Sequence, residues 1–427
     1  MKKGTRLKLL LVGALTIAVG QKSRAQFTLS AEIRPRTEMR NGFKTPSSDG
    51  FKPAVFTEQR SRIYFDYKQP KYQLKLAFQD VRFWGETTQV FKKELGTTFL
   101  SEAWGELNLT EKVSVKAGRQ IISYDNERFL GGLEWAQQGR RHDAILLKIE
   151  DGAKASKLHF GFAFNSDQDI AEPALLQRTV ANYYSVAGNY KSMQYAWYNK
   201  SFKDGKLSIL AFNNGVQNAD STVSNKQTTG FVLSKKFGKV TFETENYYQT
   251  GKLGKSEVGA ILASINATVQ TKLTPLTLGY EYISGKDDSD ASSKVTAFSP
   301  DYGTNHAHNG FMDYFFVGPA NGNVGVQDFY IKTKFKLGKG TLMAHGHQFL
   351  TGSKQLTESG GVLNKSMGTE VDLVYVQKIG SDITFNLGYS QLFASETMLA
   401  LRPGNKPSNN WAWAMITFKP TLLSSNN

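Results

Sequence analysis

Apolar and polar residues alternate one by one in segments that recur from residue 27 to residue 419. Alternation with a period of two is typical of β-strands that have one face buried. We therefore predict an all-β chain of eighteen strands, with no helical stretch or linker between them. The predicted strands are residues 27–40, 55–68, 71–84, 99–109, 113–123, 141–150, 157–166, 186–203, 206–216, 227–237, 239–250, 256–272, 274–284, 324–337, 340–351, 368–379, 381–393 and 410–419.

The connections between these strands alternate between short turns, such as Gln69-Pro70, Gly238 and Gly338-Lys339, and long loops. Short turns on one rim and long loops on the other are typical of an outer-membrane β-barrel, in which the short turns are periplasmic. A soluble β-sandwich, the alternative fold, gives no reason for this alternation. The long loops cover about 41–54, 85–98, 124–140, 167–185, 217–226, 285–323, 352–367 and 394–409.

Single strands carry one polar and one apolar face, because side chains alternate sides along a strand. The first strand has its charged side chains on one face, namely Glu32, Arg34, Arg36, Glu38 and Arg40. In a membrane barrel with a wet interior, the polar face lines the lumen and the apolar face meets lipid. We expect Trp411, Trp413 and Phe418 of the last strand among the lipid-facing or interfacial aromatics.

The N-terminal residues predict export. Four basic residues within the first eight positions precede an apolar run from Leu9 to Val19, and a short polar stretch closes on Ala25. This order is typical of a secretory signal peptide, residues 1–25, which leaves residues 26–427 as a single barrel domain. A retained membrane helix is the alternative, but the run of eleven apolar residues is well short of the roughly 20 that span a bilayer. Removing residues 1–25 lowers the formal net charge from +15 to +9.

Composition narrows the remaining classes. No stretch of 18 apolar residues follows Gln26, so the mature chain has no transmembrane helix and can span a membrane only as a closed barrel. The chain has no cysteine, which removes disulfides and thiol chemistry. We expect a protein of the bacterial outer membrane, with lipid and the barrel assembly machinery as partners. No nucleic-acid partner and no cofactor are expected.

Several segments resemble the alginate export family of outer-membrane barrels. One is Gly118-Arg119-Gln120, followed by the run Tyr124–Phe129, by Trp135 and by the run Gln138–Asp143. Further matches are Tyr282-Ile283-Ser284-Gly285 with Thr304–Asp313, Arg34-Pro35-Arg36 with Gly42-Phe43, and the final strand from Trp411 to Phe418. The resemblance covers essentially the whole mature chain. It implies an 18-stranded barrel that carries an acidic polysaccharide such as alginate outward through an arginine-lined pore.

Arginine suits an anion path, because its guanidinium stays charged and offers a planar fork to carboxylates. We predict a substrate path lined by Arg34, Arg36, Arg60, Arg62 and Arg119. Glu32 and Glu58 alternate with these arginines, so the lumen is of mixed sign. Two interpretations stay open for each arginine. It attracts anions, or it pairs with a glutamate across strands and braces the interior.

Two long loops hold the other candidate residues. The rim loop carries Asp125, Glu127, Arg128, Arg140, Arg141 and Asp143. It either folds inward as a constriction, which we favour, or forms a solvated lid. The long loop carries Asn305, His306 and Asp313, and it is the one candidate for a plug. Neither the acidic run at Asp287, Asp288 and Asp290 nor the pair His306 and His308 has the pattern of a metal site, so no metal is expected.

The sequence therefore predicts a porin-like channel for the passive passage of an anionic polar solute. The alternative transport function is a general or oligosaccharide-uptake porin. An adhesin or receptor is less favoured. So is an outer-membrane hydrolase, for which Ser123, His142 and Asp143, or His306 with Asp313, are the only candidates and have no nucleophile-elbow context.

Overall fold

A computed structural model describes residues 25–86, 98–165, 190–218, 222–316 and 324–425 of the chain. Eighteen long antiparallel strands of this described part close into one barrel, which confirms the predicted fold class. These strands are β1 (Gln26–Asn41), β2 (Ala54–Lys68), β3 (Tyr72–Phe83), β4 (Thr98–Asn108), β5 (Val113–Gln120), β6 (His142–Asp151), β7 (Ser156–Phe164), β8 (Ser192–Phe202), β9 (Gly205–Gln217), β10 (Val223–Phe237), β11 (Val240–Leu253), β13 (Ala260–Gln270), β14 (Pro275–Ile283), β15 (Val326–Leu337), β16 (Gly340–Leu350), β17 (Ser366–Ile379), β18 (Ile383–Ala394) and β19 (Ser408–Phe418).

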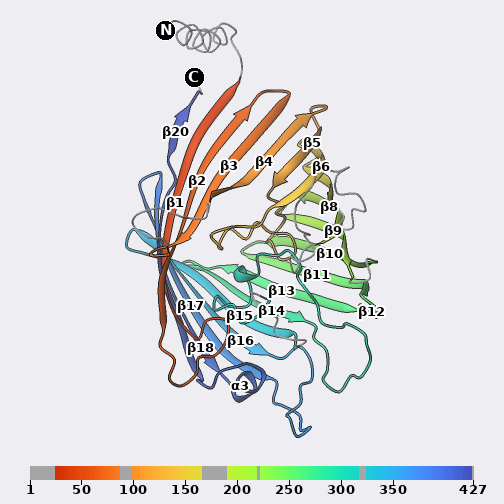
Figure 1. Ribbon diagram of the computed structural model, residues 1–427, viewed down its shortest axis with the longest axis vertical. Helices are drawn as coiled ribbons and strands as arrows, with labels where there is room; N and C mark the ends of the chain where they lie inside the picture. The colour runs from red at the N-terminus through yellow and green to blue at the C-terminus, as the bar shows by residue number, and fades with distance from the viewer. Residues whose placement is uncertain (1–24, 87–97, 166–189, 219–221, 317–323, 426–427) are drawn as a thin grey trace, which may run out of the picture.

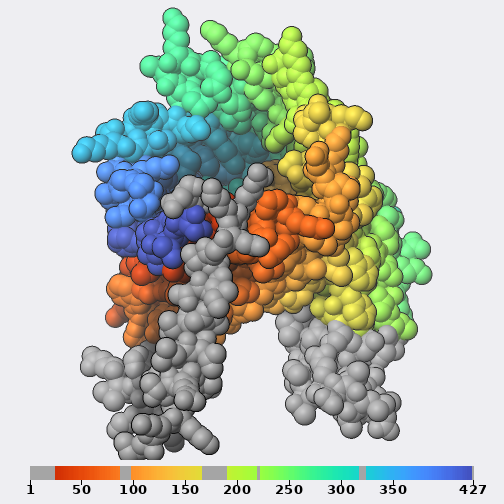
Figure 2. Space-filling view, turned by 90° about the horizontal axis from the view of Figure 1, so that it is seen from above, coloured from red at the N-terminus to blue at the C-terminus, as the bar shows by residue number. Residues whose placement is uncertain are grey.

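Each strand pairs with the next in the chain, and β19 returns to pair with β1 through partners such as Arg40 and Trp411. Figure 1 shows the ribbon of strands, and Figure 2, seen from above, shows the colours following one another around the ring. Two shorter strands are added to it. β12 (Ser256–Glu257) pairs with β11, and β20 (Thr421–Ser424) pairs with the start of β1. Because the sheet closes on itself, these strands have almost no unpaired edge.

The faces of the strands follow the predicted alternation. On β1, Glu32 is 3% exposed while its neighbour Ile33 is 47% exposed on the outer wall. The same change of side occurs on β15, where Asp328 is buried and Phe329 is exposed. A polar interior and an apolar outer wall suit a barrel in lipid. The described residues contain no helix with the length and apolar character to cross a membrane.

Two tryptophans of the last strand correct a prediction. Trp411 and Trp413 face the interior, where they are 0% and 7% exposed, instead of facing lipid. The pairing of β1 with β19 is the cause, since Trp411 lies directly opposite Arg40 and Trp413 opposite Glu38, and paired residues point to the same side of a sheet. The indole Nε1 of Trp411 donates to Oε2 of Glu38 at 2.9 Å, which satisfies its buried N–H.

The strand connections confirm the predicted alternation of short and long. Tight turns such as those at Gly238, Gly338 and Gly380 place the glycine at positive φ, which costs other residues more. The long connections lie at the opposite rim, where the short helix α3 (Glu396–Leu401) also lies, and Ser395 caps that helix by accepting from the Met398 N–H. The connection between β14 and β15 contains the 3-10 turn η2 (Asn305–Ala307). The predicted signal peptide lies outside the described residues except for Ala25.

Inward glycines lie opposite large aromatic side chains at several places on the wall. Gly388 faces Trp413, Gly161 faces Tyr195, and each pair is directly matched across its two strands. The ring lies over the glycine so closely that a Cβ at Gly388 would come within 2.1 Å of the Trp413 ring. An aromatic side chain that covers a glycine in this way restores the packing that glycine lacks.

Gly388→Ala is expected to destabilise the barrel by about 1–3 kcal/mol, because the new methyl group overpacks the ring of Trp413. Denaturant unfolding in lipid vesicles measures the change. Gly152→Ala is the matched control, since a Cβ there meets nothing within 4 Å. Equal stability of the two variants would contradict the proposed packing role of the glycine.

Candidate functional site

Four arginines share one patch of the inner wall, which we call the arginine cluster: Arg34 and Arg36 of β1 with Arg60 and Arg62 of β2. All four are buried, with 3 to 7% of each residue exposed. The strand register places Arg34 directly opposite Arg60, and it places Arg36 opposite Glu58. Like charges opposite one another repel, so this patch needs acceptors from elsewhere in the molecule.

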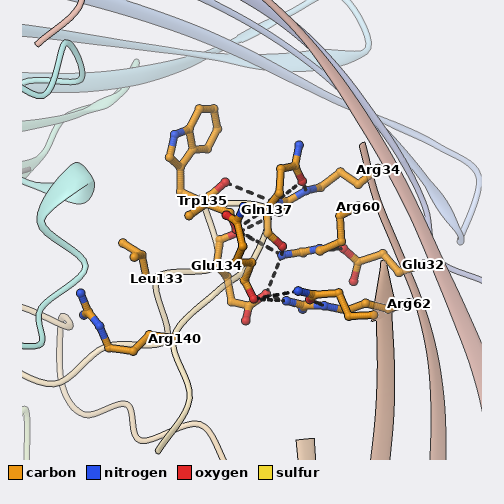
Figure 3. A network of polar contacts seen from close by, with 12 residues as sticks. Glu32, Arg34, Arg60, Arg62, Leu133, Glu134, Trp135, Gln137 and Arg140 are labelled. Atoms are coloured by element: carbon orange, nitrogen blue, oxygen red, sulfur yellow. Dashed lines mark hydrogen bonds and ion pairs between the residues drawn. The ribbon is translucent and has the colours of Figure 1, made fainter. Parts of the chain in front are cut away.

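Those acceptors come from the connection between β5 and β6, residues 121–141, which we call the inner loop. Figure 3 shows Arg34, Arg60 and Arg62 directed side by side at its segment Glu134–Gln137. Arg34 donates to the backbone oxygen of Glu134 at 2.8 Å and to Oε1 of Gln137 at 2.9 Å. Arg36 donates to the backbone oxygen of Trp135 at 2.8 Å. The loop therefore folds into the barrel, as the sequence favoured, and the arginine cluster holds it there.

Glu134 is the charged centre of this contact. Its Oε2 accepts from Arg60 at 3.0 Å and from Arg62 at 2.7 Å, and its Oε1 lies 2.8 Å from Arg141. Burial on its own would raise the pKa of this carboxyl, but the positive charges of Arg62, Arg141 and Arg60 outweigh burial and lower the pKa to about 2. Glu134 is therefore ionised under ordinary conditions and neutralises part of the arginine charge.

The patch nevertheless keeps a positive excess. Six arginines meet here with four glutamates, which leaves a formal charge of +2; the residues are Arg34, Arg36, Arg40, Arg60, Arg62 and Arg141 with Glu32, Glu38, Glu58 and Glu134. Among the described residues Arg34 has no carboxylate in an ion pair, since it bonds only to Gln137 and to backbone oxygens. The pairing interpretation thus describes most of these arginines, while Arg34 keeps an uncompensated charge.

A second segment folds inward from the connection between β14 and β15. Its residues 284–316 are called the second inner loop. Thr304 donates its N–H to the backbone oxygen of Glu127, and the N–H of Gly131 donates to the oxygen of Tyr302 at 2.9 Å. The ring of Trp135 is stacked between His306, 4.5 Å away, and the guanidinium of Arg36, 4.1 Å away. In Figure 1 the 3-10 turn η2 of the second inner loop lies within the ring of strands, where Thr304 meets the inner loop.

The wall on the other side of these loops is acidic. Arg128 of the inner loop reaches it and donates to Glu281 at 2.5 Å and to Asn309 at 3.2 Å. A cavity of about 310 Å³ lies at this contact. Its charged lining is formed by Arg128, Glu243, Glu245, Glu281, Asp328 and Lys332. The interior therefore presents positive charge on β1 and β2 and mostly negative charge from β11 to β15.

The remaining residues of the predicted rim loop take part in these contacts. Asp125 accepts from Trp197 and from Ser208 on the wall. Glu127 bonds to Ser123 and to Thr304, while Arg140 donates to the backbone oxygen of Gly303. In the second inner loop, Asn305 donates to the oxygen of Phe316, and Nδ1 of His306 lies 2.6 Å from Asp313. Glu127 and Arg140 thus join the two loops, Asp125 joins the inner loop to the wall, and the contacts of Asn305 and His306 brace the second inner loop internally.

Arg119 and Asp143 correct a prediction. They pair with each other at 3.0 Å, and both side chains lie on the outer face of the strands, 41% and 64% exposed. Their neighbours Gln120 and His142 are the buried, inward residues. The physical reason is strand parity, because residues at odd separation along a strand point to opposite sides. Arg119 is therefore not part of the lumen lining.

Of the candidate enzyme residues, His306 and Asp313 lie side by side, but Ser123, His142 and Asp143 are not brought together. The Oγ of Ser123 bonds to Glu127, His142 Nδ1 lies 3.2 Å from the hydroxyl of Tyr190, and Asp143 faces outward. His308 bonds to the backbone oxygen of Asn126, so it does not converge with His306 on one point. The acidic run is also engaged, since the carboxylates of Asp287 and Asp288 accept from backbone N–H groups at Lys354 and Leu356.

Sequence reasoning missed a second cluster on the inner wall, formed by His345 and His347 of β16 with Glu370 and Asp372 of β17. The sequence did contain a signal for this cluster. His345 and His347 are two positions apart in one predicted strand, and Glu370 and Asp372 are two positions apart in the next, so each pair shares a face. The sequence alone does not give the register that brings the two pairs together.

The alginate export family, by its sequence model, matches residues 25–409. Three solved porin structures from Pseudomonas aeruginosa are similar in fold. OpdK with vanillate has 10% identity, covers 94% of this chain and 99% of its own, and has a TM-score of 0.60. OccK2 (OpdF) in complex with glucuronate has 13% identity, covers 93% of this chain and 98% of its own, and has a TM-score of 0.59. OccK3 (OpdO) has 10% identity, covers 93% of this chain and 96% of its own, and has a TM-score of 0.61. Among curated proteins, none matches the sequence.

Glu134→Gln is expected to loosen the inner loop at neutral pH and to give larger, noisier single-channel currents in planar bilayers. In the wild-type protein the same change is expected as the pH falls from about 4.5 to about 2. The pKa of Glu134 is lower with the loop in place than in a released loop. The stabilisation that Glu134 gives to the inner loop is therefore complete above the ordinary pKa of a glutamate. It is lost as the pH falls towards the lowered pKa of Glu134.

Glu111→Gln on a short turn at the other rim is the control for this experiment and should behave as the wild type. Glu134→Gln currents identical to wild-type currents at neutral pH would contradict the role of this carboxylate.

Proposed function

Because the chain belongs to the alginate export family of outer-membrane channels, we propose that it passes an anionic polar solute passively through its interior. Its fold relatives are outer-membrane porins, and the barrel itself is porin-like. By family resemblance the solute is an acidic polysaccharide such as alginate. The alternative is a general or oligosaccharide-uptake porin.

The observation that carries the proposal is the positive excess of the arginine cluster, and in particular the guanidinium of Arg34. Glutamates compensate most of the neighbouring charges, but among the described residues Arg34 has no carboxylate in an ion pair. A fixed cation on the wall of a narrow channel raises the local concentration of anions. Partial compensation also favours passage, because a solute that binds too tightly does not leave.

The two inner loops support a path that is narrow and chemically asymmetric. They join each other through Thr304 and Gly131, and they lie between the arginine cluster and the acidic wall. A sugar acid has a carboxylate on one part and hydroxyl groups on the rest. In our proposal the carboxylate follows the arginine side, while the hydroxyl groups donate to acceptors such as Glu243 and Glu245 around the cavity.

The compounds recorded with the fold relatives agree with this class of solute. The OpdK structure contains vanillate and the OccK2 structure contains glucuronate, and both compounds are carboxylates. Alginate is a polymer of sugar acids, so it has the same charged group on each unit. These relatives share only 10 to 13% identity with the chain, so they support the chemical class and not a particular compound.

Reversal potentials in planar bilayers with a salt gradient are expected to show anion selectivity for the wild-type protein. Arg34→Gln should move the anion-to-cation permeability ratio towards one, because it removes the uncompensated charge of the cluster. Arg119→Gln removes the same charge from the outer face, so it is the matched control and should leave the ratio unchanged. Cation selectivity of the wild type, or equal effects of both variants, would contradict the proposal.

Vesicle swelling separates the anion channel from a general porin. Glucuronate and glucose are close in size but differ in charge, so vesicles containing the protein are expected to swell faster in glucuronate than in glucose at equal osmolarity. Arg34→Gln should reduce this preference and leave glucose entry nearly unchanged. Equal rates for both compounds in the wild type would favour the general porin.

A further inference from the structure

Two histidines and two carboxylates meet on the inner wall, away from the arginine cluster. The pairing of β16 with β17 sets His345 directly opposite Asp372 and His347 directly opposite Glu370. All four side chains point inward, since residues two apart on a strand share a face. His347 and Asp372 are each 1% exposed in their side chains. The closed register of the barrel therefore builds this cluster.

Several polar atoms of the cluster have no hydrogen-bond partner among the described residues. They include Nδ1 of His345, Oδ2 of Asp372 and Oε2 of Glu370, all of which are buried. Nε2 of His347 lies 3.9 Å from Oδ2 of Asp372, too far for a hydrogen bond. His345, His347 and Asp372 each offer one ligand atom, and these atoms lie within 4.8 Å of one another. Buried polar atoms without partners require a water molecule, a shared proton or a bound ion to satisfy them.

The surrounding side chains orient the cluster. Nδ1 of His347 lies 2.9 Å from Asp328, so its Nε2 is the nitrogen left to face Asp372. Oδ1 of Asp372 accepts from the hydroxyl of Ser390 at 2.5 Å, which leaves Oδ2 free. A histidine that donates its second N–H to a carboxylate is the usual arrangement around a protein-bound metal ion, because it fixes the ring and its tautomer.

The charge of the cluster also favours a cation. Asp328, Glu370 and Asp372 are three carboxylates, and Lys332, which faces His345 from β15, is the cationic side chain beside them. With neutral histidines the formal sum is −2. Carboxylates buried in such a region are stable only if they are paired, protonated or bound to a metal ion. A divalent cation would supply the missing charge.

We propose that His345, His347 and Asp372 bind a divalent transition-metal ion of the zinc class, with the carboxylate of Glu370 close by on the same strand as Asp372. Two imidazoles with carboxylates suit zinc and its neighbours, whereas calcium and magnesium favour oxygen ligands alone. Ligand atoms about 2.1 Å from a tetrahedral ion lie about 3.4 Å apart. Here Nε2 of His347 is 3.9 Å from Oδ2 of Asp372, and all three ligand atoms lie within 4.8 Å of one another, so side-chain adjustments of about 1 Å would close the site. This inference does not rest on the proposed solute.

A cavity beside the cluster offers a path by which an ion could enter, and the second inner loop covers the cluster. His345 lines a cavity of about 350 Å³ together with Thr268, Thr277, Lys332 and Lys334. The second inner loop lies over the cluster, since the ring of Phe311 is 5.2 Å from His345 and the N–H of Met312 donates to Oε1 of Glu370 at 2.8 Å. A bound ion would therefore hold the wall residues that anchor this loop.

The full-length protein in detergent is first stripped of metal with a chelator. Calorimetric titration with zinc chloride then tests the proposal. Saturable binding of one ion per chain is expected, and cobalt in place of zinc should give the visible absorption of a tetrahedral complex. His345→Gln and Asp372→Asn should each abolish both signals. His345→Gln is the cleaner variant, because its Nδ1 has no hydrogen bond to lose. Asp328→Asn should weaken binding by about 10–100-fold, the usual effect of a partner that orients a ligand.

His159→Gln is the matched control, since His159 is another inward histidine beside a carboxylate, 2.8 Å from Glu150, and lies on β7 away from the cluster. It should bind zinc as the wild type does. The heat-modifiable migration of each variant in gel electrophoresis shows whether its barrel is folded. Absence of saturable zinc binding in the folded wild type, or unchanged binding in folded His345→Gln and Asp372→Asn, would overturn the proposal. Anion selectivity is measured separately, so the two proposals can fail independently.

Discussion

The interior of this barrel depends on one constraint, which is that a buried guanidinium cannot lose its charge and must find acceptors. The pairing of β1 with β2 sets Arg34 directly opposite Arg60, and the two strands do not offer enough acceptor oxygens for both guanidinium groups. The inner loop supplies backbone oxygens from Glu134 to Gln138 and the carboxylate of Glu134. A loop that could lie outside the barrel is therefore drawn into it. The second inner loop packs on the first and is positioned by it.

This arrangement links the fold to transport. Glutamates neutralise most of the arginine charge, which stabilises the wall, while Arg34 donates to Gln137 and to backbone oxygens of the inner loop. Arg128 extends the same loop to the acidic wall at Glu281, so the loop separates two surfaces of opposite charge. The chain belongs to the alginate export family, and its fold relatives are outer-membrane porins.

Local patterns in the sequence were enough to predict the fold. The site depends on strand register and on the path of the loops, which local patterns do not encode. Period-two alternation depends only on neighbouring residues, so the eighteen strands and the inward face of Arg34 and Arg36 could be predicted. Arg119 was misplaced because this strand has charged residues on both faces: Lys116 lies opposite the buried Glu106 and faces inward, so Arg119, three positions on, faces outward. Trp411 and the pair of His345 with Asp372 depend on the register between strands. The contacts of Trp135 and Gln137 depend on a loop path that no periodicity encodes.

The most direct test of this account is the distance between the inner loop and the wall. The chain has no cysteine, so cysteines introduced at the exposed positions Gln138 and Lys68 can carry two spin labels specifically. Pulsed electron paramagnetic resonance should give one narrow distance distribution in this background. The distribution should become broad when Arg34, Arg60 and Arg62 are all replaced by glutamine. A broad distribution with the arginines present, or an equally narrow one without them, would contradict the claim that the arginine cluster holds the loop inside the barrel.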